Sequence, residues 1–365
     1  MAVDEDVVPL REETPDERRR QRRRSRWVLI AAVLLIVVPA VVVFGGAWLV
    51  GQAIDQDVQR IPDAFDIPET QRPQKEPEAG STEPAQVGTT FLLAGTDRRS
   101  EELTTGEGAQ APSWLPGAQR SDAILLAHVT EDGQRAYVVS IPRDSWVDIP
   151  GYGSNKINAA FSFGGPSLYV QTIEQLTDTR IDHLAVIDWT GLTQLVDVLG
   201  GVELTFPTET QARGRTWPAG THTLSGKEVL DYVGERYALP RGDFDRVERQ
   251  QAVIRSLAAK LISEGVLTDP AKALDVATAT AQLVSVDDTL DVATMVSLAL
   301  RSRDLRPETV TFMTAPTAGT GFEGSQSVVY LDAAAQDGFW QAFRTDTLEQ
   351  WVQQNGARTT PETVS

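Results

Sequence analysis

The chain has 365 residues, a formal net charge of -18 and a pI of about 4.6, which excludes a broadly basic nucleic-acid-binding surface. It contains no cysteine, so disulfides, thiolate zinc sites and cysteine nucleophiles are excluded as well. The three histidines lack the spacing of a histidine zinc site. We therefore expect neither a nucleic acid partner nor a zinc enzyme.

The N-terminal segment has the pattern of a membrane anchor. Residues 27–50 are apolar, and roughly 24 residues at 1.5 Å each span a hydrocarbon core of about 30 Å. Seven arginines between residues 18 and 26 precede this stretch, so the positive-inside rule places residues 1–26 in the cytoplasm. A cleaved signal peptide is the alternative, although its apolar core is shorter, about 7–15 residues. The pattern favours a single transmembrane helix in the plasma membrane and an extracellular C-terminal domain.

Composition changes again after the predicted anchor. Residues 51–87 are rich in Pro, Glu, Gln and Asp and lack apolar periodicity, which predicts an extracytoplasmic linker. Residues 88–356 are long enough for one large catalytic domain with a substantial core. Residues 357–365 are predicted to be a disordered tail.

Short apolar or β-branched runs alternate with helical patterns throughout this domain. Strands are predicted at 89–95, 123–130, 136–142, 183–188, 201–205, 309–314 and 327–331. Helices are predicted at 166–177, 189–199, 225–236, 243–264, 270–283, 291–303 and 332–344. This alternation predicts an α/β fold, a three-layer α/β/α domain with a central mixed sheet. Turn-forming residues at 104–118 predict a mobile flap near the end of the first strand.

Acidic residues lie at the end of the first predicted strand and the start of the second. Asp97 follows the first strand and Asp122 precedes the second, and the ends of buried strands are where α/β proteins place ligand sites. A hard ion such as Mg²⁺ is held by one or two carboxylates plus phosphate oxygens, so these two could suffice. Asp97 could equally be a turn residue, and Asp122 a partner for Arg120.

The third predicted strand ends at Pro142, which cannot donate a ladder hydrogen bond. Arg143 follows it directly. The residue order therefore predicts a guanidinium at the same kind of strand end as Asp97.

A second cluster of arginines lies between Tyr232 and Gln251. If Asp243 opens a helix, then Arg246, Arg249 and Gln250 share one face, and Arg236 comes from the preceding segment. Converging guanidinium and amide donors form a receptor for phosphate or pyrophosphate oxygens. The alternative is a solvated helix face whose charges pair with Asp243 and Glu248.

Eight segments in order together resemble the LytR-CpsA-Psr family over residues 88–345. They are GTDRR (95–99), RSD (120–122), SIPRDSWV (140–147), KINAAF (156–161), GG (164–165), VDVLGGVEL (196–204), LSGKEVLDYV (224–233) and GDFDRVERQQ (242–251). Any one of these motifs alone would be weak, but their shared order is specific.

The resemblance implies an extracytoplasmic α/β/α domain that binds a polyprenyl-pyrophosphate-linked glycopolymer with its lipid tail in an apolar pocket. It also implies Mg²⁺-dependent transfer of the glycosyl phosphate to a peptidoglycan hydroxyl. In this sequence Asp97 and Asp122 match the Mg²⁺ ligands, and Asp243 matches an acid that orients or deprotonates near the arginines. The residues that match pyrophosphate contacts are Arg99, Arg120, Arg143, Arg236, Arg246 and Gln250. With the two magnesium ligands, Arg120, Arg143, Arg236, Asp243 and Arg246 make up the expected catalytic set.

One position departs from the family pattern. Gly234 stands where the family usually has an arginine two residues before the one that matches Arg236. We expect Gly234 in a helix interior and expect transfer to be reduced. Two other functions remain open: hydrolysis of the same lipid pyrophosphate, and binding of the lipid-linked polymer without catalysis.

Overall fold

The computed structural model describes residues 59–75, 85–98, 119–235, 239–266, 268–269, 272, 275–276, 279, 282–357, 359–361 and 363. All of them belong to one unit, Ile54–Ser365. The predicted anchor at 27–50 and the predicted flap at 104–118 lie outside the described residues. Within the described ranges, no helix is both long and apolar enough to cross a membrane.

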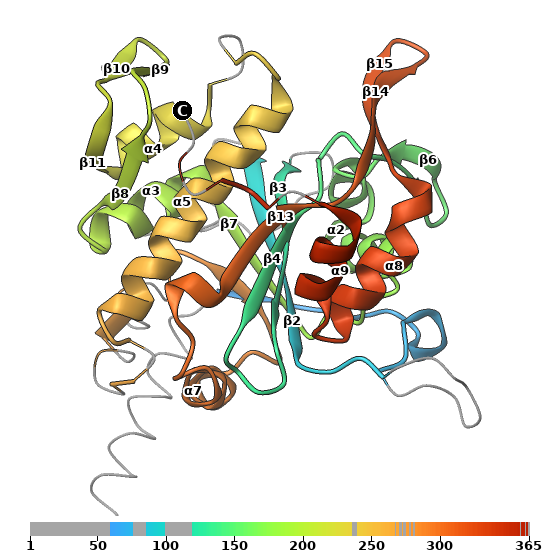
Figure 1. The fold of residues 1–365 in the computed structure, drawn as a ribbon. Helices are drawn as coiled ribbons and strands as arrows, with labels where there is room; N and C mark the ends of the chain where they lie inside the picture. Colours follow the sequence, from blue (N-terminus) through green and yellow to red (C-terminus); the bar gives the residue numbers. More distant parts are fainter. Residues whose placement is uncertain are drawn as a thin grey trace, which may run out of the picture. The chain divides into compact units, whose positions relative to one another are not determined.

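A mixed seven-stranded sheet forms the centre of this unit (Figure 1). Its order is β1 (Gln59–Ile61), β12 (Ser285–Asp287), β7 (His183–Asp188), β2 (Thr89–Arg98), β3 (Gln119–Val129), β4 (Ala136–Ser140) and β13 (Val310–Thr314). The pairs β1/β12, β7/β2 and β4/β13 are parallel, and the other three are antiparallel. The central mixed sheet is therefore confirmed.

Alternation along the strands sends side chains to two different layers. Leu92 and Leu126 join a core formed with α2 (Ala159–Thr177), α8 (Ala333–Arg344) and α9 (Leu348–Asn355). Leu125 faces the other way and packs against Ile254 of α5 (Asp243–Ser263). Figure 1 shows α5 on one side of the sheet and α8 and α9 on the other. The three-layer arrangement is thus present as expected.

A smaller group of elements extends the α5 layer. It contains α3 (Trp189–Val198), α4 (Gly226–Val233) and two ribbons, β8 (Val202–Phe206) with β11 (Gly220–Leu224) and β9 (Thr210–Ala212) with β10 (Arg215–Trp217). Buried side chains from these elements pack on α5 around Phe206, Trp217 and Tyr232. This second core holds α3 and α4 against the long helix.

Two ribbons and one helix lie outside these layers. The ribbons β5 (Trp146–Ile149) with β6 (Gly153–Lys156) and β14 (Thr317–Glu323) with β15 (Gln326–Leu331) form separate antiparallel pairs. Helix α7 (Val292–Arg301) follows β12. Figure 1 shows the β14–β15 ribbon projecting from the rest of the domain.

The domain begins earlier than residue 88, which corrects the predicted linker. Residues 59–75 fold onto the sheet: β1 pairs with β12, and Ile61 lies in the core with 1% of its surface exposed. Arg72 donates two hydrogen bonds to Glu174, Nε to Oε2 at 2.9 Å and Nη2 to Oε1 at 2.6 Å. The segment looks like a linker by composition because only a few of its side chains make these contacts.

The predicted disordered tail is also corrected where the structure describes it. The Thr360 amide donates to the Phe312 carbonyl at 2.8 Å, and Arg255 Nη2 donates to the Thr360 carbonyl at 2.9 Å. The Thr360 hydroxyl also contacts Gln251, which is fully buried in α5. This part of the tail is therefore fixed to α5 and β13.

Candidate functional site

The ends of β2 and β3 bring Asp97 and Asp122 to neighbouring backbone positions. Gly95 pairs with Ala123 but Thr96 pairs with Ser121, so Asp122 is the extra residue of a β-bulge. Asp97 is in register with Arg120, but the structure describes only the backbone of these two residues. Arg99 and Arg236 lie outside the described residues. The bulge thus aims Asp122 away from the regular alternation of β3.

Asp122 faces Arg143 in the structure. The carboxylate is 4% exposed and accepts a hydrogen bond from Arg143 Nη1. Arg143 Nε also lies 3.6 Å from Asp243 Oδ1 and 3.9 Å from Asp144 Oδ2. Burial lowers the pKa of Arg143, but the negative charges of Asp122, Asp243 and Asp144 outweigh it and raise that pKa. The predicted strand-end guanidinium is therefore present and firmly cationic.

Asp243 is the first residue of α5 and lies between two guanidiniums. Its Oδ1 contacts Arg143 and, one turn along the helix, Arg246 Nη2. Its Oδ2 is buried and has no hydrogen-bond partner among the described residues. Gly242, just before it, has φ 59°, a conformation that glycine adopts without strain and that turns the chain into the helix. The arrangement leaves one carboxylate oxygen available to a ligand or cation.

The predicted single face of α5 is divided in the structure. Arg246 and Gln250 are buried, with 2% and 9% exposure, and face the site. Arg249 instead stacks 4.6 Å over the Tyr232 ring, and burial lowers its pKa. Arg241 is 59% exposed and pairs with Asp245, which is buried, and with Glu248. Arg241 and Glu248 form a charge-paired helix face, and the phosphate receptor stays a prediction for Arg246 and Gln250.

Several buried polar atoms have no hydrogen-bond partner among the described residues. They are Thr96 Oγ1, Ser145 Oγ, Asp243 Oδ2 and Gln250 Nε2. They come from the end of β2, the segment after β4 and the first turns of α5. Because an unmade buried hydrogen bond costs about 1–3 kcal/mol, such atoms indicate a place for a polar ligand.

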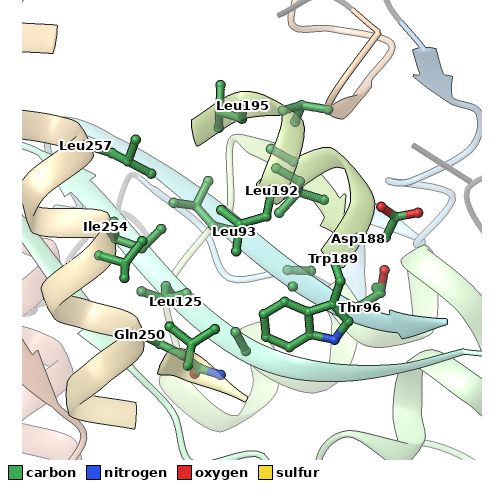
Figure 2. A pocket seen from close by; sticks show the side chains of 18 residues that line it. Leu93, Thr96, Leu125, Asp188, Trp189, Leu192, Leu195, Gln250, Ile254 and Leu257 are labelled. Atoms are coloured by element: carbon green, nitrogen blue, oxygen red, sulfur yellow. The ribbon is translucent and has the colours of Figure 1, made fainter. Parts of the chain in front are cut away.

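An apolar cavity of about 220 Å³ is lined in part by two of these residues, Thr96 and Gln250. Gln250, Ile254 and Leu257 follow one another along α5, while Leu192 and Leu195 of α3 face them (Figure 2). The sheet contributes residues including Leu93, Thr96, Ala123, Leu125 and Ala185. The cavity therefore has polar atoms at Thr96 and Gln250 and aliphatic walls along α5 and α3.

The donor chemistry near Asp122 suits a hard cation. Asp122 and Asp243 supply carboxylate oxygens, and Asp97 occupies an adjacent backbone position. Among the residues with described side chains, no three His, Cys, Asp or Glu residues form a metal-binding group. Two carboxylates completed by phosphate oxygens of a substrate are a usual arrangement for Mg²⁺.

Gly234 lies at the end of α4, which corrects the expected helix interior. It is the C-cap residue, with φ -87° and ψ -4°. A Cβ atom there would lie 2.5 Å from both Cζ and Nη2 of Arg213. The space beside Gly234 is therefore filled by a guanidinium from elsewhere in the sequence.

Some neighbours of the site were missed from the sequence. Lys156 Nζ lies 3.0 Å from Asp144 Oδ1, which joins the β5–β6 ribbon to the segment that carries Arg143. Trp189 and Leu192 line the cavity from α3. Asp144 and Lys156 belong to the quoted motifs, but the pairing of the two segments could not be read from their spacing.

Comparison with known proteins agrees with this architecture. The LytR_cpsA_psr family model matches residues 58–344. The cell wall biosynthesis protein LcpA of Corynebacterium glutamicum is 32% identical over 70% of this chain and 56% of its own length. The polyisoprenyl-teichoic acid–peptidoglycan teichoic acid transferase TagU of Enterococcus faecalis is 34% identical over 50% of this chain and 60% of its own length. The chain thus spans little more than half the length of these curated relatives.

A solved structure supports the fold. The crystal structure of B. subtilis TagV superposes with a TM-score of 0.57 at 21% identity and covers 73% of this chain and 99% of its own. The family model starts at residue 58, next to β1, and so includes the segment before residue 88 that the sequence-based boundary left out. Because the family model matches most of the chain, this protein belongs to the LytR_cpsA_psr family.

Proposed function

We propose that this protein transfers a glycopolymer phosphate from a polyprenyl-pyrophosphate carrier to peptidoglycan. The observation that carries the proposal is the meeting of an apolar cavity with a buried cluster of arginines and carboxylates. Gln250 lies in the cavity wall one turn from Arg246, which contacts Asp243. A ligand with a long hydrocarbon chain and an anionic head group would fill the cavity with its chain and bind the arginines with its head group.

The cavity favours a chain over a compact apolar ligand. Its aliphatic walls follow α5 from Gln250 to Leu257 with α3 opposite. Each buried CH₂ group contributes roughly 0.8 kcal/mol, so several prenyl units would supply most of the affinity. Chain length beyond the cavity would extend toward the bilayer.

The pyrophosphate would bind at the arginines. Two of the proposed phosphate-binding arginines, Arg143 and Arg246, have side chains that the structure describes. We propose that Arg99, Arg120 and Arg236 also contact the pyrophosphate. Gln250 Nε2, a buried donor, would contact a phosphate oxygen. Arginine donors in a buried site bind phosphate oxygens in pairs, which orients the group as well as neutralising it.

We further propose that Asp97 and Asp122 hold Mg²⁺ together with phosphate oxygens of the substrate. When bound, the ion would neutralise charge on the pyrophosphate. Asp243 would accept the proton of the acceptor hydroxyl through Oδ2, which has no hydrogen-bond partner in the part of the chain that the structure describes. The hydroxyl oxygen would then bond to the sugar-linked phosphorus as the bond to the bridging oxygen breaks, and polyprenyl phosphate would leave.

The enzyme would thus be a Mg²⁺-dependent phosphotransferase in the plasma membrane. Residues 1–26 would be cytoplasmic, and the domain would face peptidoglycan outside the cell. Two relatives whose names refer to cell wall biosynthesis and teichoic acid transfer support these partners.

The test is a transfer assay with the full chain in lipid nanodiscs. The substrates are a polyprenyl-pyrophosphate glycan and peptidoglycan fragments, with and without Mg²⁺, and both ligated glycan and free polyprenyl phosphate are measured. We expect equal amounts of the two products. Arg246→Ala should weaken donor binding at every Mg²⁺ concentration, whereas Asp122→Ala should remove the Mg²⁺ dependence. Arg303→Ala, at an arginine that is 66% exposed, is the matched control.

Other outcomes would replace the proposal. Free polyprenyl phosphate without ligated glycan would identify a hydrolase. Tight donor binding without either product would identify a binding protein.

A further inference from the structure

The tip of the β9–β10 ribbon carries an arginine in a conformation that arginine rarely adopts. Ala212 pairs with Arg215, which leaves Arg213 and Gly214 as a two-residue turn. Both have positive φ, 46° and 81°. Turns of this kind favour Asn-Gly, since a long side chain gains nothing there unless it makes a compensating contact.

Arg213 makes two such contacts with the end of α4. Its Nη2 donates to the Gly234 carbonyl at 2.9 Å, and its backbone amide donates to Glu235 Oε2 at 2.9 Å. The guanidinium therefore satisfies a carbonyl at the C-terminal end of a helix, where the helix dipole favours a positive charge. The left-handed conformation of Arg213 allows its guanidinium and its backbone amide to reach two consecutive residues, Gly234 and Glu235.

Gly234 is matched to this guanidinium. A Cβ atom at residue 234 would lie 2.5 Å from Cζ and Nη2 of Arg213, well inside van der Waals contact. The backbone conformation of Gly234 does not itself require glycine, because its φ is -87°. Glycine at this position therefore leaves room for the Arg213 guanidinium and for the Leu230 carbonyl oxygen, which would lie 2.7 Å from a Cβ atom.

The end of α4 is also bound to α5, the helix that carries Arg246 and Gln250. Arg249 of α5 donates from Nη1 to the Tyr232 carbonyl at 3.2 Å and stacks on the Tyr232 ring. Arg249 is the neighbour of Gln250 in the cavity wall. Arg213 thus holds the end of α4 from the ribbon, and Arg249 holds the same end from α5.

We propose that Arg213 is a positioning residue for the candidate site. It fixes residues 234 and 235, where the chain leaves α4, and through the contact of Arg249 with Tyr232 it fixes the part of α5 that carries Arg246 and Gln250. Its effect on transfer rests on the proposed function, but its effect on the position of α5 does not.

Arg213→Asn separates positioning from stability. Asparagine tolerates the left-handed conformation better than arginine, so the turn should persist and the thermal midpoint should stay the same or rise. The Gly234 carbonyl loses its guanidinium donor. We expect amide hydrogen exchange at residues 234–235 and 243–250 to accelerate at least fivefold, and farnesyl pyrophosphate to bind at least fivefold more weakly.

The matched control is Arg215→Gln. Arg215 has the same charge on the same ribbon, but it pairs with Asp231 and Glu228 on the side of α4. This variant should leave exchange at residues 243–250 and the affinity for farnesyl pyrophosphate within twofold of the unmodified chain. A second variant, Gly234→Ala, should displace the guanidinium and reproduce the exchange pattern of Arg213→Asn. The double variant with Arg213→Asn and Gly234→Ala should show no faster amide exchange than either single variant.

The outcomes are distinguishable from failure of the proposed function. If the chain transfers no glycan but the exchange pattern changes as described, the positioning role holds and the transferase proposal fails. Unchanged exchange at residues 243–250 in Arg213→Asn would overturn the positioning role. Additive effects of Arg213→Asn and Gly234→Ala on exchange would show that the two substitutions do not act through the same contact.

Discussion

Arg143 and Asp243 join the end of the central sheet to the start of α5, with 3.6 Å between Nε and Oδ1. Asp243 also contacts Arg246, so one carboxylate balances two guanidiniums in a mostly buried place. If this were only a structural ion pair, removing the carboxylate would chiefly lower stability. If the arginines bind an anion, the same change should separate binding from turnover.

We predict that Asp243→Asn binds inorganic pyrophosphate at least as tightly as the unmodified protein. The amide keeps the shape of the carboxylate but removes a negative charge that competes with the ligand for Arg143 and Arg246. Transfer should nevertheless fall about 10²–10⁴-fold, as expected for loss of a general base. Calorimetric titration with pyrophosphate and single-turnover transfer measure the two effects.

Glu248→Gln is the control for this prediction. Glu248 lies on the same helix but pairs with Arg241, whose side chain is 59% exposed. Its replacement should leave both measurements within about twofold, in line with the small energies of exposed ion pairs. Weaker pyrophosphate binding in Asp243→Asn would show that the carboxylate organises the arginines for the anion.

Filling the cavity should shorten the lipid that the protein accepts. Ala185 lines the cavity from β7, so Ala185→Phe places a ring in the space expected for prenyl units. We expect affinity for a long polyprenyl pyrophosphate to fall tenfold or more, since each displaced CH₂ group forfeits roughly 0.8 kcal/mol. Affinity for inorganic pyrophosphate should not change.

Val198→Phe adds the same kind of ring at a residue that is 51% exposed, and it serves as the control for the cavity prediction. Binding is compared across a series of prenyl lengths. An equal loss for short and long chains in Ala185→Phe would mean that the lipid lies elsewhere.

The segment before residue 88 should be needed for stability. Glu174 is fully buried and holds Arg72 through two hydrogen bonds, so removing the segment leaves a buried charge without its main counter-ion. Breaking such a pair costs about 3–5 kcal/mol. We expect residues 88–365 to unfold at much lower urea concentration than residues 58–365.

Two substitutions isolate the ion pair from the rest of the segment. Glu174→Gln should lose most of the stability attributed to the pair, whereas Glu69→Gln, at the 65% exposed partner of Arg180, should leave the urea midpoint nearly unchanged. Equal urea midpoints for the two variants would contradict the assigned role of Arg72.

The long elements of the fold were predictable because their patterns are local. The strand predicted at 183–188 coincides with β7, and the helix predicted at 243–264 with α5. β1 and β12 have three residues each, too short for alternation to be recognised, and they pair across more than two hundred residues. These two strands form only because they pair with segments far away in the sequence, so a short stretch of sequence cannot predict them.

The site was predictable to the level of strand ends and one helix face. Asp122 and Arg143 were expected at strand ends, with Arg120 as an alternative partner for Asp122, whereas Asp243 was expected near the arginines only through the family resemblance. The direction of Arg249 was not predictable, because the ring on which it stacks, Tyr232, belongs to another helix, α4. The role of Gly234 was missed for a similar reason. Gly234 ends α4, whereas Arg213, which lies against it, comes from the turn of the β9–β10 ribbon.

Asp287 should make the edge of the sheet sensitive to acid. Burial raises the pKa of Asp287, but hydrogen bonds from His183, Thr289 and the Leu184 amide outweigh it, so this pKa lies below its ordinary value. A carboxyl group with a depressed folded-state pKa stabilises the fold above its unfolded pKa of about 3.9. That contribution is lost as the pH falls through the folded-state value.

We therefore expect Asp287→Asn to lower the free energy of unfolding by about 1–3 kcal/mol at pH 7, because the Leu184 amide loses its charged acceptor. The difference from the unmodified protein should shrink steadily below about pH 4, where the carboxylate protonates on unfolding. Asp288→Asn, at the exposed neighbouring residue, should change neither the stability nor its pH dependence. Urea unfolding between pH 7 and pH 3 measures both. A difference that stays constant down to pH 3 would mean that the carboxylate charge does not hold β12 against β7.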